Sequence, residues 1–209
     1  MRKIKLFLVV ACVAMLAACN TKPAETEKEM KYENETIATI MERRSIRKYK
    51  PETVARETLE KIMECGINAP NGQNKQSWEV RVVDNPEVMA EINAVIAEAY
   101  GEKAEMAVGC FRGAPVMVFI ARDLSYDFSA YDCGLLAENI MLSAQSLGVG
   151  SICLGSPVRI INDNEACAPV LERLGFSEGY EFCLCVGLGY ADEAPEAKPR
   201  MKEKVRFVE

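Results

Sequence analysis

The sequence predicts an α+β domain in which helices cover a mixed central sheet. Two strand patterns support this prediction. Residues 78–83 place Trp78, Val80 and Val82 on one face, whereas residues 115–121 form a continuous apolar run typical of a buried central strand. Helical and strand-like segments alternate irregularly and without internal repeats, which favours an α+β arrangement.

The other elements follow from the spacing of their apolar residues. In the second helical pattern Leu59, Ile62, Met63 and Ile67 recur at helical intervals, and Pro70 stops the pattern. The same reading predicts helices over 35–44, 55–68, 86–100, 129–147 and 164–173, and strands over 150–154 and 181–189.

The N-terminus predicts export and lipidation. Three basic residues within the first five precede an apolar stretch, Leu6–Ala18, of 13 residues, which is too short to span a bilayer and is typical of a signal peptide. Leu16-Ala17-Ala18-Cys19 resembles the bacterial lipobox, in which the cysteine is diacylated and becomes the new N-terminus. An ordinary secretory peptide cleaved near the same place is the alternative.

These features divide the chain into a lipoprotein signal peptide (1–18), a lipidated Cys19 with a flexible tether (19–34) and a folded domain (35–209). The tether is rich in Glu and Lys and has too little apolar surface to offset the entropy of ordering. Two or more acyl chains hold a protein stably on a membrane. We therefore expect a lipid-anchored protein of the bacterial cell envelope, outside the cytoplasm.

Composition excludes several classes of function. The full chain has a net charge of −6, and loss of the three N-terminal cations leaves 22 Lys plus Arg against 31 Asp plus Glu, or −9. Nucleic acid is therefore not an expected partner. The chain contains no histidine, which excludes Ser-His and Cys-His nucleophile pairs and any His-ligated metal site.

The cysteine pattern predicts free thiols. Of nine cysteines, Cys12 is lost with the signal and Cys19 is the proposed lipid site. The other seven are odd in number and irregularly spaced, which is a poor disulfide framework and lacks a paired zinc-binding pattern. Cys183 and Cys185, on an apolar strand pattern, are expected to be small core residues. Free thiols outside the cytoplasm fit a reducing or anaerobic habitat.

Residues 69–78 carry side-chain amides between a helix and a strand. Asn71, Gln73, Asn74 and Gln76 offer hydrogen-bond donors and acceptors without charge, and Gly72 permits close backbone approach. This chemistry suits the edge of a heteroaromatic ring. A hydrogen-bonded turn is the alternative.

A basic cluster lies upstream, in Arg43-Arg44-Ser45-Ile46-Arg47, and a second basic pair lies in Lys198-Pro199-Arg200. Forked guanidinium groups beside a hydroxyl match phosphate geometry. A solvated basic surface is the alternative. Because the chain is acidic overall, these cations are not general background.

Together these segments resemble the nitroreductase family of FMN-dependent oxidoreductases. Members show an Arg-Arg-Ser-x-Arg opening, an Ala-Pro-Ser-x-x-Asn-x-Gln-Pro-Trp loop and a late Lys-x-Arg, and the resemblance runs from about Ile37 to Arg200. A fourth element agrees: Asp132-Cys133-Gly134 opens a long helix, and Gly148-Val149-Gly150-Ser151 leads to Leu154-Gly155-Ser156. This chain departs from the pattern at Asn71, which replaces Ser, and at Ser77, which replaces Pro.

The resemblance implies an FMN site whose flavin carries the chemistry, with no protein acid or base required. Arg44 either shares in phosphate binding or faces solvent, and Arg47 lies near the pyrimidine end of the flavin. The resemblance also implies that the phosphate and ribityl end is bound by Arg43, Ser45, Lys198 and Arg200. The ring edge is contacted by Asn74 and Gln76, and by Pro70, Asn71 and Gly72 from the other subunit. Backbone groups of Gly155 and Ser156 lie on the opposite side of the ring.

The resemblance also implies a homodimer in which residues 191–209 cross the partner, and a hydride transfer from a reduced donor through FMN to a nitroaromatic, quinone or related small acceptor. NAD(P)H is the family's usual donor but is scarce outside the cytoplasm, so a quinol or an exported redox partner is an alternative. Three other functions stay open: a membrane-anchored flavin-binding lipoprotein without catalysis, a reductive dehalogenase-like member of the family, and a structural envelope protein that binds no flavin.

Overall fold

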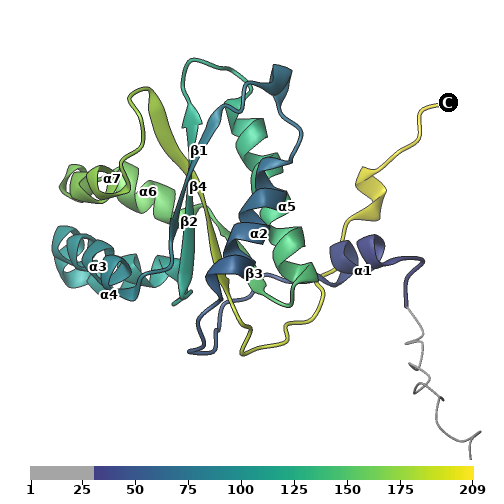
Figure 1. Ribbon diagram of the computed structural model, residues 1–209, viewed down its shortest axis with the longest axis horizontal. Coiled ribbons are helices and arrows are strands. Elements are labelled where there is room, and N and C mark those ends of the chain that lie inside the picture. The colour runs from purple at the N-terminus through teal and green to yellow at the C-terminus, as the bar shows by residue number, and fades with distance from the viewer. Residues whose placement is uncertain (1–30) are drawn as a thin grey trace, which may run out of the picture.

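The computed structural model describes residues 31–209, so the predicted signal peptide, Cys19 and most of the tether lie outside the described residues. Figure 1 shows a sheet between two layers of helices. One face is covered by α3 (Pro86–Tyr100), α4 (Ala104–Val108), α6 (Ser156–Asn162) and α7 (Ala168–Leu174), and the other by α2 (Arg56–Ile67) and α5 (Ser129–Ser146).

Four strands form the sheet, in the order β1-β2-β4-β3. Their bounds are Trp78–Val83 for β1, Val116–Asp123 for β2, Gly150–Leu154 for β3 and Tyr180–Gly189 for β4. Each neighbouring pair is antiparallel, and within residues 31–209 the parallel component is an isolated bridge between Ser45 and Ser151. The predicted α+β arrangement is confirmed.

The helix α1 (Glu35–Glu42) precedes this core, and short 3-10 turns connect other elements. The Asn34 side chain caps α1 by accepting a hydrogen bond from the Ile37 N–H at 3.0 Å. The 3-10 turns are Gly72–Asn74, Gly101–Lys103, Gly109–Phe111, Glu165–Cys167 and Lys202–Lys204.

Strand β2 forms the centre of the molecule, as its continuous apolar run predicts. Its side chains alternate between the two helical layers: Met117 and Phe119 pack toward α3 and α7, and Val118 and Ile120 pack toward α2 and α5. All four of these side chains are fully buried. A strand buried on both faces cannot alternate apolar with polar residues, which explains the uninterrupted run.

Three helical segments differ from the predictions. The predicted helix 164–173 is a 3-10 turn followed by α7, and Pro169 lies in the first turn of α7, where its missing N–H costs no hydrogen bond. Neither α4, which has only five residues, nor α6 was predicted from the sequence. Pro157, in the first turn of α6, is a helix-start signal that could have predicted this helix.

The cysteines from Cys65 onward are free thiols in the structure. Cys185 is fully buried, as predicted, but Cys183 is only half-buried, because it lies at an irregularity in the pairing of β2 with β4. Among the described helices, none has the length and apolar character needed to cross a membrane.

Candidate functional site

The amide loop, residues 70–77, is fixed by a buried carboxylate. Asp132, in the first turn of α5, accepts hydrogen bonds from the Gly72 N–H at 3.0 Å and from the Ser77 hydroxyl at 2.6 Å. Asp132 is 3% exposed and Ser77 is 1% exposed. Hydrogen bonds to an ionised group inside a protein are among the stronger ones. Asp132 therefore couples the loop rigidly to α5.

Within the loop, the backbone adopts strained conformations, and the amides face outward. Gln73, Asn74 and Gln76 have φ values of 55°, 54° and 49°, in the left-handed region that non-glycine residues seldom occupy. The Asn71 side-chain oxygen accepts a hydrogen bond from the Gln76 N–H at 2.9 Å, which stabilises this shape. The side chains of Gln73, Asn74 and Gln76 are exposed. Strain of this kind is concentrated at functional sites.

Gly72 also has a packing role that could not be predicted from the sequence. A Cβ atom at this position would lie 2.0 Å from the hydroxyl of Tyr126, so any other residue here would require the Tyr126 side chain to move. The ammonium of Lys75 lies 4.2 Å from the centre of the Tyr126 ring. Tyr126 therefore packs against the loop at two points and adds to the support that Asp132 provides.

The basic cluster lies along the edge of β3. The Ile46 N–H donates to the Ser151 carbonyl at 2.9 Å, and Ser45 forms a parallel bridge with Ser151. The Ser151 hydroxyl is buried and has no hydrogen-bond partner within the described residues. Such a group is rare because a buried polar atom without a hydrogen bond costs free energy. Its position beside Ser45 is a candidate anion site.

Arg43 approaches the same edge. Its guanidinium Nε lies 3.9 Å from a Glu138 carboxylate oxygen, a long ion pair, and the Arg43 side chain is 20% exposed. Cys153 is exposed, yet desolvation by its neighbours raises the pKa of its thiol, the Glu138 carboxylate raises that pKa further, and Arg43 lowers it. Arg43 therefore places a largely desolvated positive charge close to Ser45 and Cys153.

The other two arginines of the cluster are engaged by the backbone. Arg44 Nη1 donates to the carbonyl oxygens of Met41 and Arg43, each at 2.8 Å, and so caps the end of α1. Arg47 Nη1 donates to the Ser45 carbonyl at 3.0 Å, and the Arg47 backbone N–H donates to Glu193. These bonds give Arg44 a structural role at the end of α1, which neither of its two predicted roles, phosphate binding or exposure to solvent, included.

Helix α5 and strand β3 both carry residues that lie beside the amide loop or the basic cluster. Asp132 and Glu138 are six residues apart on α5, or about 9 Å along its axis. On β3, Ser151 and Cys153 point to the same side of the strand, and Gly155 follows where the strand ends and α6 begins. Gly155 and Ser156 are exposed at that end.

The remaining predicted residues are not gathered into these clusters. Lys198 and Arg200 lie in the exposed C-terminal segment, where the Arg200 guanidinium donates to the Lys198 carbonyl at 3.0 Å. Pro70 is exposed at the start of the amide loop.

Three residues of the site were not predicted as such from the sequence: Asp132, Ser151 and Cys153. The role of Asp132 could have been predicted, because an acidic residue within an otherwise apolar helix pattern is expected to have hydrogen-bond partners. Ser151 and Cys153 carried none beyond their place in the β3 pattern. Within residues 31–209, no group of three or more acidic or cysteine side chains is arranged to hold a metal ion.

The site thus combines the half-buried Arg43, two serines that pair through their backbones and an amide loop fixed by Asp132. The model of the Nitroreductase family matches residues 40–190. The chain therefore belongs to the nitroreductase family, and the predicted oxidoreductase class is confirmed.

Several known proteins resemble the chain. The NADPH-flavin oxidoreductase of Vibrio harveyi is 31% identical over 183 residues, which cover 82% of this chain and 72% of the relative. A nitroreductase with bound FMN from Desulfitobacterium hafniense is 35% identical with a TM-score of 0.75, over 85% of this chain and 100% of that one. A second, from Bacteroides fragilis, is 27% identical with a TM-score of 0.75, over 84% and 100%.

The Asp132 anchor gives a testable prediction. Asp132→Ala leaves the Gly72 N–H and the Ser77 hydroxyl without partners, and we expect it to lower the free energy of unfolding by about 2–4 kcal/mol. Urea denaturation measures the change. The matched variant Asp127→Ala, at an exposed position just before α5, is expected to change stability by less than about 0.5 kcal/mol. Equal effects of the two variants would show that the loop does not depend on Asp132.

Proposed function

We propose that this protein is an FMN-dependent oxidoreductase that passes electrons from NAD(P)H to a small aromatic acceptor such as a nitro compound or a quinone. The observation that carries this proposal is the buried Ser151 hydroxyl without a partner in the described part of the chain, beside Ser45 and near Arg43. A phosphate oxygen satisfies that hydroxyl. The FMN-bound solved relatives and the name of the Vibrio relative support the same cofactor and donor.

The residues present fit an FMN phosphate. The Arg43 guanidinium has no short ion pair in the described residues, so charge-assisted hydrogen bonds to a phosphate are open to it. Ser45 and Ser151 add hydroxyl groups where the basic cluster pairs with β3. Lys198 and Arg200 are not gathered into this cluster within one chain, and in the dimer that we propose the C-terminal segment would bring their two positive charges to it. Together these groups balance about two negative charges of a phosphate monoester.

The amide loop fits the polar edge of the flavin ring. When bound, FMN accepts two electrons from the donor and delivers them to the acceptor. Asn74 and Gln76 present exposed side-chain amides to hold and orient the ring edge, whereas the Asn71 oxygen is already used by the Gln76 N–H. Arg47 supplies positive charge near the ring, and backbone groups of Gly155 and Ser156 line its other side.

Removal of the phosphate contacts tests the cofactor assignment. We expect Arg43→Ala combined with Arg200→Ala to weaken FMN binding about hundredfold or more, because two charge-assisted hydrogen bonds of about 1.5–3 kcal/mol are lost. The measurement is the flavin absorbance that remains after desalting, with FMN titration by fluorescence. The matched control removes two distant cations, Lys103→Ala and Arg173→Ala, and retains its flavin. Stoichiometric flavin in the first variant refutes the phosphate assignment.

A second copy of the chain completes the assembly that we propose. No residue of α1 is buried, and Ile40 and Met41 on it are 51% and 53% exposed. In the C-terminal segment Val205 and Phe207 are 73% and 93% exposed. Figure 1 shows that α1 and this segment leave the body of the molecule on the same side. Large apolar side chains of this kind need a partner surface.

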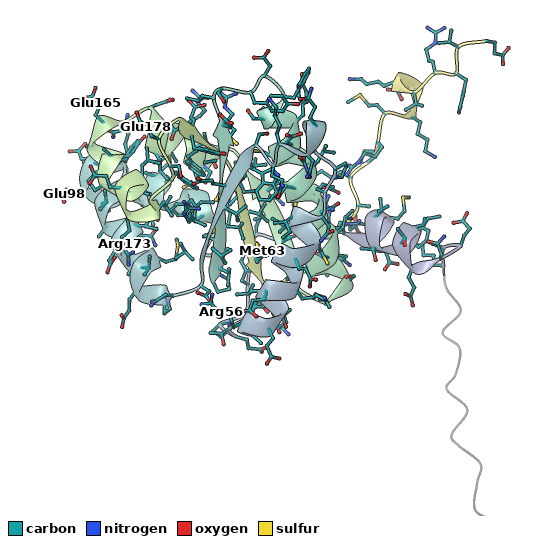
Figure 2. All side chains as sticks on the ribbon, turned by 45° about the horizontal axis from the view of Figure 1, so that its top comes forward. Arg56, Met63, Glu98, Glu165, Arg173 and Glu178 are labelled. Atoms are coloured by element: carbon teal, nitrogen blue, oxygen red, sulfur yellow. The ribbon has the colours of Figure 1, made fainter. Side chains whose placement is uncertain are left out.

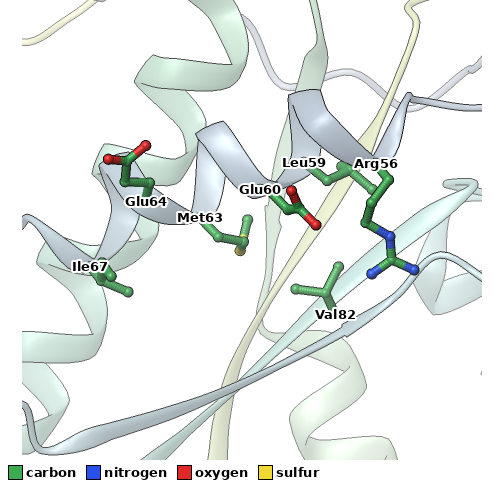
Figure 3. A pocket seen from close by; sticks show the side chains of 7 residues that line it. All are labelled: Arg56, Leu59, Glu60, Met63, Glu64, Ile67 and Val82. Carbon is green, nitrogen blue, oxygen red and sulfur yellow. The ribbon is translucent and has the colours of Figure 1, made fainter.

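An apolar groove between α2 and β1 offers that surface (Figure 3). Leu59, Met63 and Val82 line it, it measures about 320 Å³, and Glu60 and Glu64 stand at its rim. β1 is also an edge strand of the sheet. The sequence Lys204-Val205-Arg206-Phe207 alternates charged with apolar residues, so an extended tail from the partner places Val205 and Phe207 in the groove and Lys204 and Arg206 on the opposite, outward face.

In Figure 2 Met63 lies near the middle of the view with Arg56 below it, whereas Glu98 and Arg173 lie at the left. The face that carries α3 and α7 is therefore separate from the groove. The dimer uses the face of α2 and the free edge of β1, and residues 70–72 of one subunit then meet the cofactor of the other.

The tail assignment predicts a change in oligomeric state. Val205→Ser with Phe207→Ser removes the apolar contacts of both tails and is expected to raise the dimer dissociation constant about hundredfold or more, from roughly 1.5–3 kcal/mol for each side chain. Sedimentation velocity over a concentration series measures it. The control Lys202→Ser with Glu209→Ser keeps the apolar residues. A dimer of unchanged strength in the first variant contradicts the groove assignment.

We also propose that the mature protein is held on the cell envelope by acyl groups on Cys19. The support is the basic start, the short apolar stretch and the lipobox-like end at Cys19, all outside the described residues. Cys19→Ser is expected to move the protein from the membrane fraction to the soluble fraction and to abolish incorporation of labelled palmitate. Cys12→Ser is the control. Palmitate labelling that survives Cys19→Ser refutes the anchor.

A further inference from the structure

A β-bulge in strand β4 redirects one cysteine. Ile120 on β2 lies opposite Leu184, and the next residue, Ala121, lies opposite Phe182, so Cys183 is an extra residue without a partner on β2. An extra residue of this kind bends the strand and changes the direction of its side chain. Cys183 is half-buried and lines a surface hollow of about 460 Å³, in contrast to the fully buried Cys185.

A second cysteine reaches the same bulge from α5. The Cys133 thiol donates a hydrogen bond to the carbonyl oxygen of Ala121, at a sulfur to oxygen distance of 3.7 Å, and Cys133 is 1% exposed. Cys133 and Cys183 both line the hollow, and the pKa shifts of their two thiols are linked. The two cysteines are 50 residues apart in sequence, so the fold itself creates the pair.

The two thiols are electrostatically different. Interaction with the Cys133 thiol lowers the pKa of Cys183, burial raises that pKa, Arg122 lowers it and Glu181 raises it, with a net decrease. The pKa of Cys133 is raised, first by its interaction with Cys183 and then by burial. Cys183 is thus the more acidic and more accessible thiol, and Cys133 is the protonated, enclosed one. Dithiol exchange uses this division between attacking and resolving cysteines.

The surroundings of the pair suit a small, charged molecule. Arg122 forms an ion pair with Glu181 at 2.6 Å, and Arg159 lies 3.8 Å from Asp163. All four of these charged residues line the hollow. Its volume lies within the range of small-molecule sites. Two cations and two acids line the same hollow, and this balance of charges suits a zwitterionic, amino-acid-like ligand.

From these observations we propose that Cys133 and Cys183 form a thiol–disulfide exchange site for small zwitterionic disulfides of the amino-acid type. The Cys183 thiolate attacks one sulfur of the disulfide and forms a mixed disulfide, and the released thiolate takes up a proton. Cys133 then loses its proton and attacks the sulfur of Cys183, which releases the second thiol. The protein dithiol is oxidised by two electrons to a disulfide, and the small disulfide is reduced to two thiols. The site does not depend on FMN.

The test equilibrates the full-length, FMN-loaded protein with mixtures of reduced and oxidised glutathione under anaerobic conditions. Free thiols are blocked with N-ethylmaleimide, and the protein is digested with chymotrypsin, which cuts after Leu184 and separates Cys183 from Cys185. Mass spectrometry is expected to find a Cys133–Cys183 linked peptide whose amount follows the glutathione ratio and which disappears on reduction. Absence of this peptide at every ratio, in protein that retains its flavin, overturns the proposal.

Variants separate the two roles. In Cys133→Ser the reaction is expected to stop at a glutathione adduct on Cys183, and in Cys183→Ser the enclosed Cys133 stays unmodified. Arg122→Gln is expected to slow adduct formation about threefold to tenfold at neutral pH, because less Cys183 thiolate is present. Cys65→Ser, on α2, is the control and behaves as the parent protein does. Rapid modification of Cys133 in the absence of Cys183, or an unmodified Cys183 in Cys133→Ser, contradicts the assigned roles.

Discussion

The buried carboxylate of Asp132 is the interaction on which the candidate site depends. A charge inside a protein is tolerated only when hydrogen bonds replace its hydration, and here the Gly72 N–H and the Ser77 hydroxyl supply them. The same two bonds hold a loop with three residues in left-handed conformations, which are costly for side chains other than glycine. The position of α5 therefore determines the direction in which the exposed amides of the loop point.

The candidate anion site at Ser45 and Ser151 is assembled in a different way, by strand pairing at the sheet edge. The segment that contains Ser45 runs beside β3 and continues to Tyr49, whose hydroxyl donates to the Ile46 carbonyl at 2.9 Å and whose pKa is raised by burial well above its ordinary value. This pairing leaves the Ser151 hydroxyl buried without a partner among the described residues. This unpartnered hydroxyl and the exposed apolar residues of α1 and of the C-terminal segment are consistent with the cofactor-bound dimer that we propose.

Helix α5 serves both this site and the proposed dithiol. Asp132 anchors the amide loop, and the adjacent Cys133 lines the hollow beside the bulge of β4. The bulge separates the two cysteines of β4, Cys183 and Cys185, into different environments, one half-buried and one fully buried. A regular strand would have kept both thiols in the apolar core, where neither is reactive.

Much of the fold could be predicted from the sequence, because local periodicity determines it. Strands 78–83 and 150–154 and helix 86–100 have the predicted bounds, and the arginine, serine and amide motifs identify the family. What the tertiary structure decided depends on residues far apart in the chain: the acceptor role of Asp132, the unpartnered hydroxyl of Ser151 and the redirected side chain of Cys183. A spacing pattern carries no information about which distant group lies opposite, so these features follow only from strand pairing and helix packing.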